Sequence, residues 1–174
     1  MSDKIDGYAA AITAVASVEG NLDTVADELY QFARAIDAND SLRTTLADRS
    51  LPASRRLGVV ESLLDGSANP TTINLVSLMV GADRGGAISA VADRVLQRAA
   101  DAQGKRVAEV RSAIALTPDQ VDRLAEALGR ATGSAVDVQV VIDSSVMGGL
   151  VAQVGDTVID GSVKTRLEKL KERV

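Results

Sequence analysis

The chain has 174 residues and a net charge of −5, and its 46% apolar and 25% charged residues are typical of one or two globular domains. It contains no histidine and no cysteine, which excludes the usual catalytic triads, disulfides and ordinary zinc sites. With one Phe, two Tyr, no Trp and an acidic balance, nucleic acid is not expected as the main partner. No apolar run approaches the ~18 residues of a membrane span. The N-terminus shows no signal-peptide pattern, so we expect an intracellular protein.

Helical spacing of apolar residues dominates the first 104 residues. Gly20 ends the first pattern and Asn21 is expected to cap the second. Asn39, Pro52 and the pair Asn69-Pro70 begin further helices. The sequence therefore predicts a six-helix bundle over residues 1–104, with helices near residues 3–18, 22–36, 42–46, 52–64, 70–80 and 88–103.

The fifth of these patterns is apolar on nearly every side between Ile73 and Val80. Such a helix either lies at the centre of the bundle or is half covered and binds a partner. The sequence leaves both interpretations open.

After Gly104 the apolar period changes from that of helices to that of strands. Residues 108–116 and 136–142 alternate, and Thr117-Pro118-Asp119-Gln120 between them is a capping box that opens a helix ending near Gly133. The helix connects the strand of residues 108–116 to that of residues 136–142, and a connection of this length favours parallel pairing of the two strands. Residues 150–154 and 157–160 are expected to form a short antiparallel hairpin. We therefore predict an α+β chain, with a small C-terminal α/β domain over residues 105–174 that contains a mixed four-stranded sheet.

The hairpin and the residues after it carry the most conspicuous polar side chains. Asp156 and Asp160 are a pair of carboxylates that acid–base chemistry could use, but Gly155-Asp156 fits a tight turn and Asp160-Gly161 fits a helix cap and joint. The helix predicted next has a basic side, which is either the solvated side of a docking helix or an adaptor for an anionic surface. Its apolar stripe consists of Val163, Leu167, Leu170 and Val174.

The order of the predicted elements and the C-terminal segments together resemble the family of delta subunits of bacterial F-type ATP synthases, known in mitochondria as the oligomycin-sensitivity-conferring protein, over the whole length of the chain. Tyr8-Ala9-Ala10-Ala11-Ile12 and Asp83-Arg84 support the resemblance more weakly, and Gly7 departs from it where the family more often has a basic residue. The segments that carry it are Val146-Met147-Gly148-Gly149-Leu150, Val154-Gly155-Asp156-Thr157-Val158-Ile159-Asp160-Gly161-Ser162-Val163 and Arg166-Leu167-Glu168-Lys169-Leu170.

The resemblance implies a non-catalytic stator subunit, without cofactor or metal, that links the catalytic head of the synthase to its peripheral stalk. It implies that the bundle binds the N-terminal helix of an alpha subunit in a groove between its first and fifth helices, here around Tyr8, Ile12, Val15, Ile73, Val76 and Val80. The C-terminal domain would hold the C-terminal helices of the b subunits through Val163, Arg166, Leu167 and Leu170. Contact with the membrane would be indirect, at the cytoplasmic face of the plasma membrane or at a thylakoid.

Overall fold

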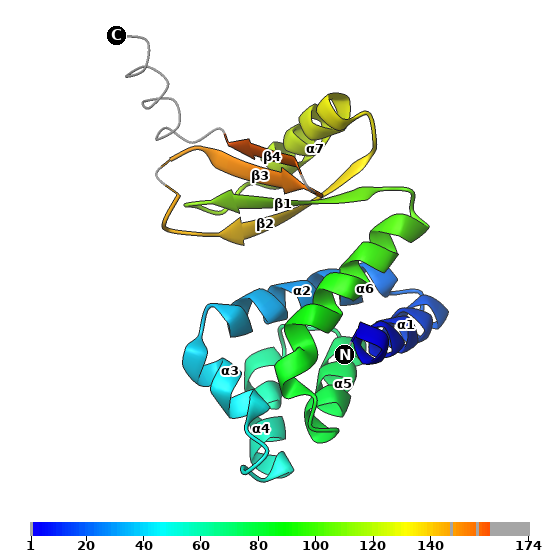
Figure 1. Cartoon of the computed structure of the whole chain (residues 1–174), viewed down its shortest axis with the longest axis vertical. Helices are drawn as coiled ribbons and strands as arrows, with labels where there is room; N and C mark the ends of the chain where they lie inside the picture. Colours follow the sequence, from blue (N-terminus) through cyan, green and yellow to red (C-terminus); the bar gives the residue numbers. More distant parts are fainter. Residues whose placement is uncertain (1, 147, 156, 161–174) are drawn as a thin grey trace. The chain divides into compact units, whose positions relative to one another are not determined.

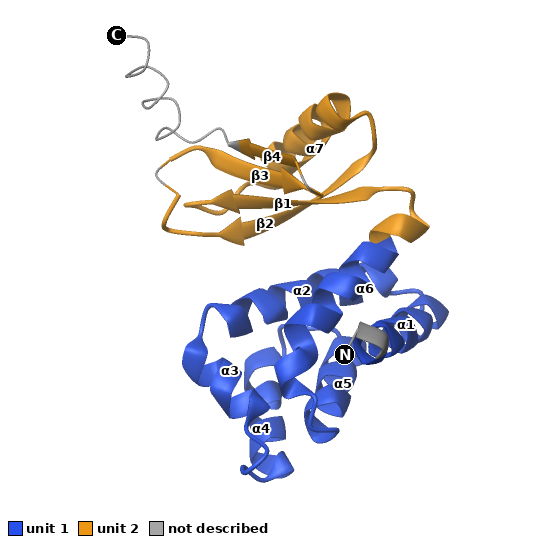
Figure 2. Ribbon diagram, in the orientation of Figure 1, with its two compact units in different colours: residues 1–99 blue, residues 100–174 orange. Residues whose placement is uncertain are grey.

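The computed structural model describes all residues except 1, 147, 156 and 161–174, and it has an α+β fold. The described residues form seven α-helices, one 3-10 helix and one four-stranded sheet. The chain divides into two compact units, Met1–Ala99 and Ala100–Val174, shown in different colours in Figure 2. The division falls within the last helix before the sheet, whereas the sequence placed the boundary after Gly104.

The first unit is helical, and its elements follow the predicted order (Figure 1). The helices are α1 (Ser2–Val18), α2 (Leu22–Asp37), α3 (Asp40–Ala47), α4 (Ala53–Leu64), α5 (Pro70–Gly81) and α6 (Ile88–Ala102). A 3-10 turn, η1 (Gly85–Ala87), precedes α6.

Two of the side-chain caps that the sequence predicts at helix starts are present, and the one predicted at Asn21 is not. The Asn39 side chain accepts a hydrogen bond from Leu42 N at 3.0 Å, and Asn69 accepts one from Thr71 N at 2.9 Å. Asn21 does not cap α2, which corrects the prediction. Its Nδ2 instead donates to Thr71 Oγ1 of α5 at 2.9 Å.

The core of the helical unit is made of aliphatic side chains contributed by all six of its helices. Leu29, Leu46, Met79 and Ile88 are among its largest fully buried members. At roughly 25 cal/mol per Å² of buried apolar surface, burial of such side chains is the main stabilising contribution.

The second unit is a sheet with one helix, α7 (Pro118–Thr132). The strands are β1 (Arg106–Ser112), β2 (Val136–Ile142), β3 (Leu150–Val154) and β4 (Thr157–Asp160), in the spatial order β2-β1-β3-β4. As predicted, β1 and β2 are parallel, and β3 and β4 form an antiparallel hairpin; β3 also pairs antiparallel with β1. The buried residues of this unit include Ala108, Val110, Leu128, Val138, Ala152 and Val154.

β1 is shorter than its alternating pattern predicts. The alternation continues to Leu116, but the strand ends at Ser112. Ser112 is opposite Ile142 on β2 and Leu150 on β3, which are the last residues of the register on both sides. Without partner backbone groups beyond this point, residues 113–117 leave the sheet.

The capping box predicted at the start of α7 is present. Gln120 N donates to the Thr117 side chain at 3.4 Å, and Thr117 N donates to the Gln120 side chain at 2.9 Å. Gly133 ends the helix in the left-handed conformation, with φ 69°.

Within the described residues, no single helix has the length and hydropathy of a membrane span. Only α5 taken together with the segment Gly85–Ala102 reaches that combination, and the two are bent by 119°.

Candidate docking surfaces

Helices α1 and α5 carry the six residues that the resemblance assigned to a partner groove. Ile12, Val76 and Val80 are buried in the core, so their side chains pack inside the unit and are not open to a partner. Tyr8 and Ile73 are half-buried. The remaining one, Val15, is 43% exposed. Of the six expected residues, three are therefore accessible at the surface: Tyr8, Val15 and Ile73.

The structure adds an apolar residue to the outer side of α5. Leu78 is 62% exposed, while Leu75, Val76, Met79 and Val80 on the same helix are buried. This arrangement answers the question that the apolar pattern left open, because α5 is half covered by the unit and half exposed. Asn74 and Ser77 interrupt the apolar run, and the exposed Asn74 lies four residues before Leu78 on the same side of α5, so the sequence held a weak signal for this outer side that the dominant apolar pattern concealed.

The C-terminal end of α1 and the N-terminal end of α5 are joined by hydrogen bonds. Thr71 Oγ1 donates to the carboxylate of Glu19, and Asn21 Nδ2 donates to Thr71 Oγ1 at 2.9 Å. Val15 lies one turn before this joint on α1, and Ile73 lies in the first turn of α5. We call the accessible residues Tyr8 and Val15 of α1 and Leu78 of α5 the α1–α5 surface. Ile73 is five residues before Leu78, about 140° around α5, and so lies on another side of the helix.

The N-terminal end of α5 is held by a carboxylate from α2. The two oxygens of Glu28 accept hydrogen bonds from Asn69 N at 3.1 and 2.9 Å, and one of them accepts a third from Thr72 Oγ1 at 2.6 Å. Thr72 is completely buried. A negative charge at this position is favourable because the first N–H groups of a helix carry partial positive charge.

The C-terminal end of α5 is held by a cation from α4. Arg56 is only 3% exposed, and its guanidinium donates to the Val80 carbonyl at 3.1 Å and to Asp83 Oδ1 at 2.6 Å. Asp83 adopts a positive φ of 58°, in the turn that follows α5. The guanidinium thus lies at the helix end where the carbonyls carry partial negative charge, and it shares the Val80 carbonyl with Asp83 N, which donates to it at 3.1 Å.

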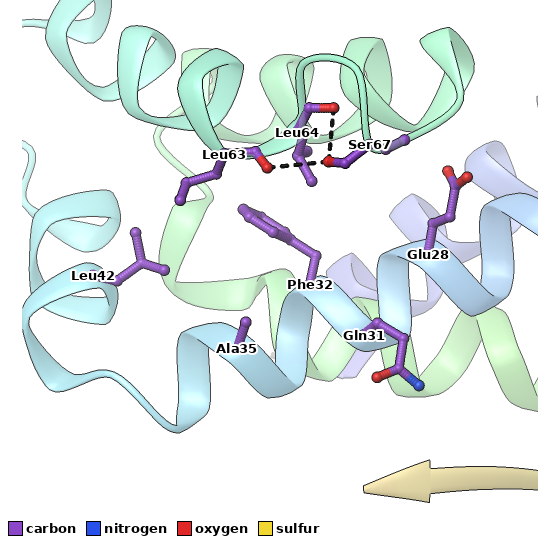
Figure 3. A pocket seen from close by; sticks show the side chains of 9 residues that line it. Glu28, Gln31, Phe32, Ala35, Leu42, Leu63, Leu64 and Ser67 are labelled. Atoms are coloured by element: carbon purple, nitrogen blue, oxygen red, sulfur yellow. Dashed lines mark hydrogen bonds between the residues drawn. The ribbon is translucent and has the colours of Figure 1, made fainter. Parts of the chain in front are cut away.

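A pocket of about 290 Å³ opens on another side of the unit, between α2, α3 and α4 (Figure 3). Its wall is mostly apolar, with Phe32 facing Leu63 and Leu64, and Glu28 lies at its edge. The Ser67 hydroxyl donates to the Leu63 and Leu64 carbonyls and so is already occupied. The pocket offers space for an apolar group and no group for chemistry.

The predicted turn and cap residues of the second unit are only partly described. Gly155 has a positive φ of 56°, as a tight hairpin turn requires, and its carbonyl accepts a hydrogen bond from Gln153 Nε2 at 3.2 Å. Asp160 is the last residue of β4, where its backbone pairs with Val151. Asp156, Gly161 and the predicted b-binding residues Val163, Arg166, Leu167 and Leu170 lie outside the described residues.

Several large apolar side chains of the second unit are exposed, and sequence analysis did not single them out. Ile114 and Ile142 lie near the ends of β1 and β2, and Val158 and Ile159 lie on β4. The signal for Ile114 was hidden because the alternation implied that it belonged to the sheet.

Two carboxylates, Asp48 and Asp143, have pKa values that are shifted by hydrogen bonds within their own turns. Hydrogen bonds from the Ser50 hydroxyl and backbone N–H lower the pKa of Asp48, and those from Ser145 lower the pKa of Asp143 in the same way. A general acid at neutral pH needs a raised pKa instead. Three or more metal-ligating side chains do not come together anywhere in the described part of the chain.

Large apolar side chains are exposed on both units, among them Val15 and Leu78 of the first and Ile142 and Val158 of the second. The sequence profile described as "ATP synthase delta (OSCP) subunit" matches residues 5–174. The chain belongs to this family.

Three relatives support the assignment. The protein named ATP synthase subunit delta of Nocardia farcinica is 40% identical over 99% of this chain and 65% of its own length. Those of Kineococcus radiotolerans and Streptomyces avermitilis are 39% and 38% identical, over 94% and 89% of this chain and 59% and 57% of their own lengths. The chain thus spans about three fifths of the length of these relatives.

A solved structure has a similar fold. A chain of the Toxoplasma gondii mitochondrial ATP synthase hexamer matches with a TM-score of 0.59 over 97% of this chain and 96% of its own length. The sequence identity is 21%, so the match concerns the fold alone.

Proposed function

We propose that this chain is a non-catalytic stator subunit of an F-type ATP synthase, which links the catalytic head to the peripheral stalk. The observation that carries the proposal is the family match over residues 5–174, which includes both units. Such a protein acts by remaining bound while the rotor turns, so its function depends on the strength and geometry of two interfaces. It would work as part of a membrane-associated complex, at the cytoplasmic face in a bacterium.

The helical unit would bind the N-terminal helix of an alpha subunit on the α1–α5 surface. The exposed Leu78 lies on α5, and the half-buried Tyr8 and the exposed Val15 lie seven residues apart on one side of α1. An amphipathic helix binds by placing its own apolar side chains against residues of this kind. Each apolar anchor that becomes fully buried would contribute roughly 1.5–3 kcal/mol.

The first prediction concerns Leu78. Leu78→Asp places a charge where the partner helix would be packed, so capture of an alpha-subunit N-terminal peptide should weaken by about 2 kcal/mol or more, which calorimetry measures. Ile12→Asp or Val76→Asp would be uninformative because those side chains are buried in the core and the variants would lose their fold.

Leu63→Asp provides a matched control for this measurement. Leu63 is a leucine of α4 with 48% exposure, outside the α1–α5 surface. It should leave peptide affinity unchanged. Equal affinity of Leu78→Asp and the unmodified chain would refute binding at this surface.

The second unit would hold the b subunits through the predicted C-terminal helix and its residues Val163, Arg166, Leu167 and Leu170. Removal of residues 161–174 should therefore abolish capture of a peptide from the C-terminal end of b. Binding of the alpha-subunit peptide, measured in parallel, should persist. If the shortened chain still captured b, the assignment of docking to the predicted C-terminal helix would be wrong, and the docking surface would lie within residues 1–160.

A further inference from the structure

Helix α5 is held at both ends by charged side chains that come from two other helices. Glu28 of α2 accepts from Asn69 N, just before the first residue of α5, and from the hydroxyl of Thr72 within the first turn. Arg56 of α4 donates to the carbonyl of Val80 in the last turn and to Asp83 just after it. Both ends of one short helix are therefore tied to neighbouring helices by directional, charge-assisted bonds.

The sign of each charge matches the helix end that it contacts. The carboxylate meets the partial positive charge of the N-terminal N–H groups, and the guanidinium meets the partial negative charge of the C-terminal carbonyls. Bonds at both ends fix the position of α5 along its axis and its rotation, because charge-assisted hydrogen bonds are short and directional. Apolar packing alone is less exact, since aliphatic side chains tolerate small sliding movements.

The burial of Arg56 indicates that this side chain serves mainly to position α5 and contributes less to the stability of the fold. A buried ion pair contributes little net stability relative to well-packed apolar residues, since desolvation of the charges offsets their attraction. Here the desolvation falls on one partner, because Arg56 is 3% exposed and Asp83 is 51% exposed, and the Nε of Arg56 has no hydrogen-bond partner among the described residues. A side chain held at that cost of desolvation is better explained by the position that it imposes on α5 than by stability.

We propose that Arg56 and Glu28 are positioning residues, which fix α5 so that Leu78 is presented to the alpha-subunit helix in one orientation. This inference rests on the proposed function, and neither residue needs to touch the partner. A helix α5 that is already held in the binding orientation reduces the conformational entropy lost on binding, because the surface does not have to become ordered when the partner binds.

The test uses the full chain and a synthetic peptide of the alpha-subunit N-terminal helix from the same organism. Arg56→Met keeps the aliphatic stem and removes both bonds, and Arg56→Lys keeps the charge but replaces the two-armed donor with a single ammonium. Peptide affinity is measured by calorimetry at a temperature where circular dichroism shows each variant fully folded. Amide hydrogen exchange of α5 is measured without peptide.

The matched control is Arg34→Met. Arg34 of α2 bonds Asp93 of α6 at 2.7 Å and does not hold α5. The expected result is peptide binding about tenfold weaker for Arg56→Met, equivalent to about 1.4 kcal/mol, with a smaller loss for Arg56→Lys and none for Arg34→Met. Hydrogen exchange should become faster in α5 and not across the rest of the helical unit.

The proposal is overturned if Arg56→Met binds the peptide within about twofold of the unmodified chain. It is also overturned if Arg34→Met loses as much affinity, because the effect would then be one of general stability. If Arg56→Met does not fold, Arg56→Lys decides by the same criteria. If the unmodified chain does not bind the peptide, the proposed alpha-subunit site is wrong, and the exchange of α5 still shows separately whether Arg56 positions the helix.

Discussion

Gly85 lies at the start of η1, where its backbone packs against the backbone near the C-terminal end of α3. A Cβ at this position would overlap the carbonyl oxygen of Leu46 and lie 2.8 Å from its carbonyl carbon. Leu46 is fully buried, so its backbone cannot move away without disturbing the core. Gly85 is thus required by the close approach of two backbone segments.

Gly85→Ala is therefore expected to lower the free energy of unfolding by about 1–3 kcal/mol, as other overpacked sites do. Urea denaturation measures the change. Gly58 lies inside α4 with nothing within 4 Å of an added Cβ. Gly58→Ala should raise the free energy of unfolding by about 0.5–1 kcal/mol, and a similar gain at Gly85 would show that η1 and α3 are not in close contact.

Single residues also decide which surfaces are open to partners. Val76 and Leu78 are two residues apart on α5, yet one is fully buried and the other largely exposed. Only the second is accessible to another chain. This is why a test of docking must use Leu78, and why a substitution of Val76 would report on folding instead.

At the scale of elements, α7 is held on the sheet by a small contact area. Leu128 is its buried residue within the core of the second unit, and Val121, Leu124 and Ala125 are only partly buried. With so little burial, the local signals at its ends matter more to its stability. The capping box at Thr117 and Gln120 satisfies N–H groups that the helix itself cannot pair.

Thr117→Ala should lower the stability of α7 by about 1 kcal/mol, since the first-turn N–H groups lose their side-chain acceptor. Thr117→Ser keeps the hydroxyl and should retain most of that stability. Amide hydrogen exchange of α7 measures the effect locally. Unchanged exchange in Thr117→Ala would mean that packing of Leu128 alone maintains the helix.

Helix α5 shows how one element combines several roles. Its buried side supports the core, its exposed side forms part of the α1–α5 surface, and its ends are bonded to Glu28 and Arg56. Because these roles use different sides and ends of the helix, they can be separated by substitution. The substitutions at Leu78 and Arg56 rely on that separation.

At the scale of the whole molecule, the two units differ in how much core supports them. The helical unit buries aliphatic side chains from six helices, whereas the second unit has a smaller cluster around Ala108, Val110 and Leu128. A small core leaves little surplus over the loss of conformational entropy. We therefore expect the helical unit to be the more independent of the two.

A fragment of residues 1–104, which includes all of α6, should remain folded by itself. Its amide NMR signals should overlay those of the same residues in the full chain, apart from positions near the cut. A fragment of residues 105–174 should be marginally stable and should gain protection against hydrogen exchange when a peptide from the C-terminal end of b is added. Collapse of the first fragment would show that its core depends on the second unit.

The sequence by itself determined the class of fold and the order of its elements. Apolar residues repeat every 3.6 residues in the helices before Gly104 and every two residues in the strands after it. These periods reflect which side of each element faces the core, so they can be recognised without knowing what that side contacts. Local signals such as Asn69-Pro70 and the Thr117 capping box act within a few residues and were predicted correctly for the same reason. The family was also evident, because the run from residue 146 to residue 170 is long and nearly ungapped.

Only the tertiary structure decided how residues distant in the sequence are paired. Asn21 bonds Thr71 of α5 and does not cap α2, β1 ends where its neighbouring strands end, and Arg56 finds Val80 and Asp83. The same holds for α5, where burial of Val76 and exposure of Leu78 depend on which helices lie beside it. Apolar spacing reports that a side chain prefers to be buried, but which apolar residues remain outside is set by the area that the neighbouring elements can cover.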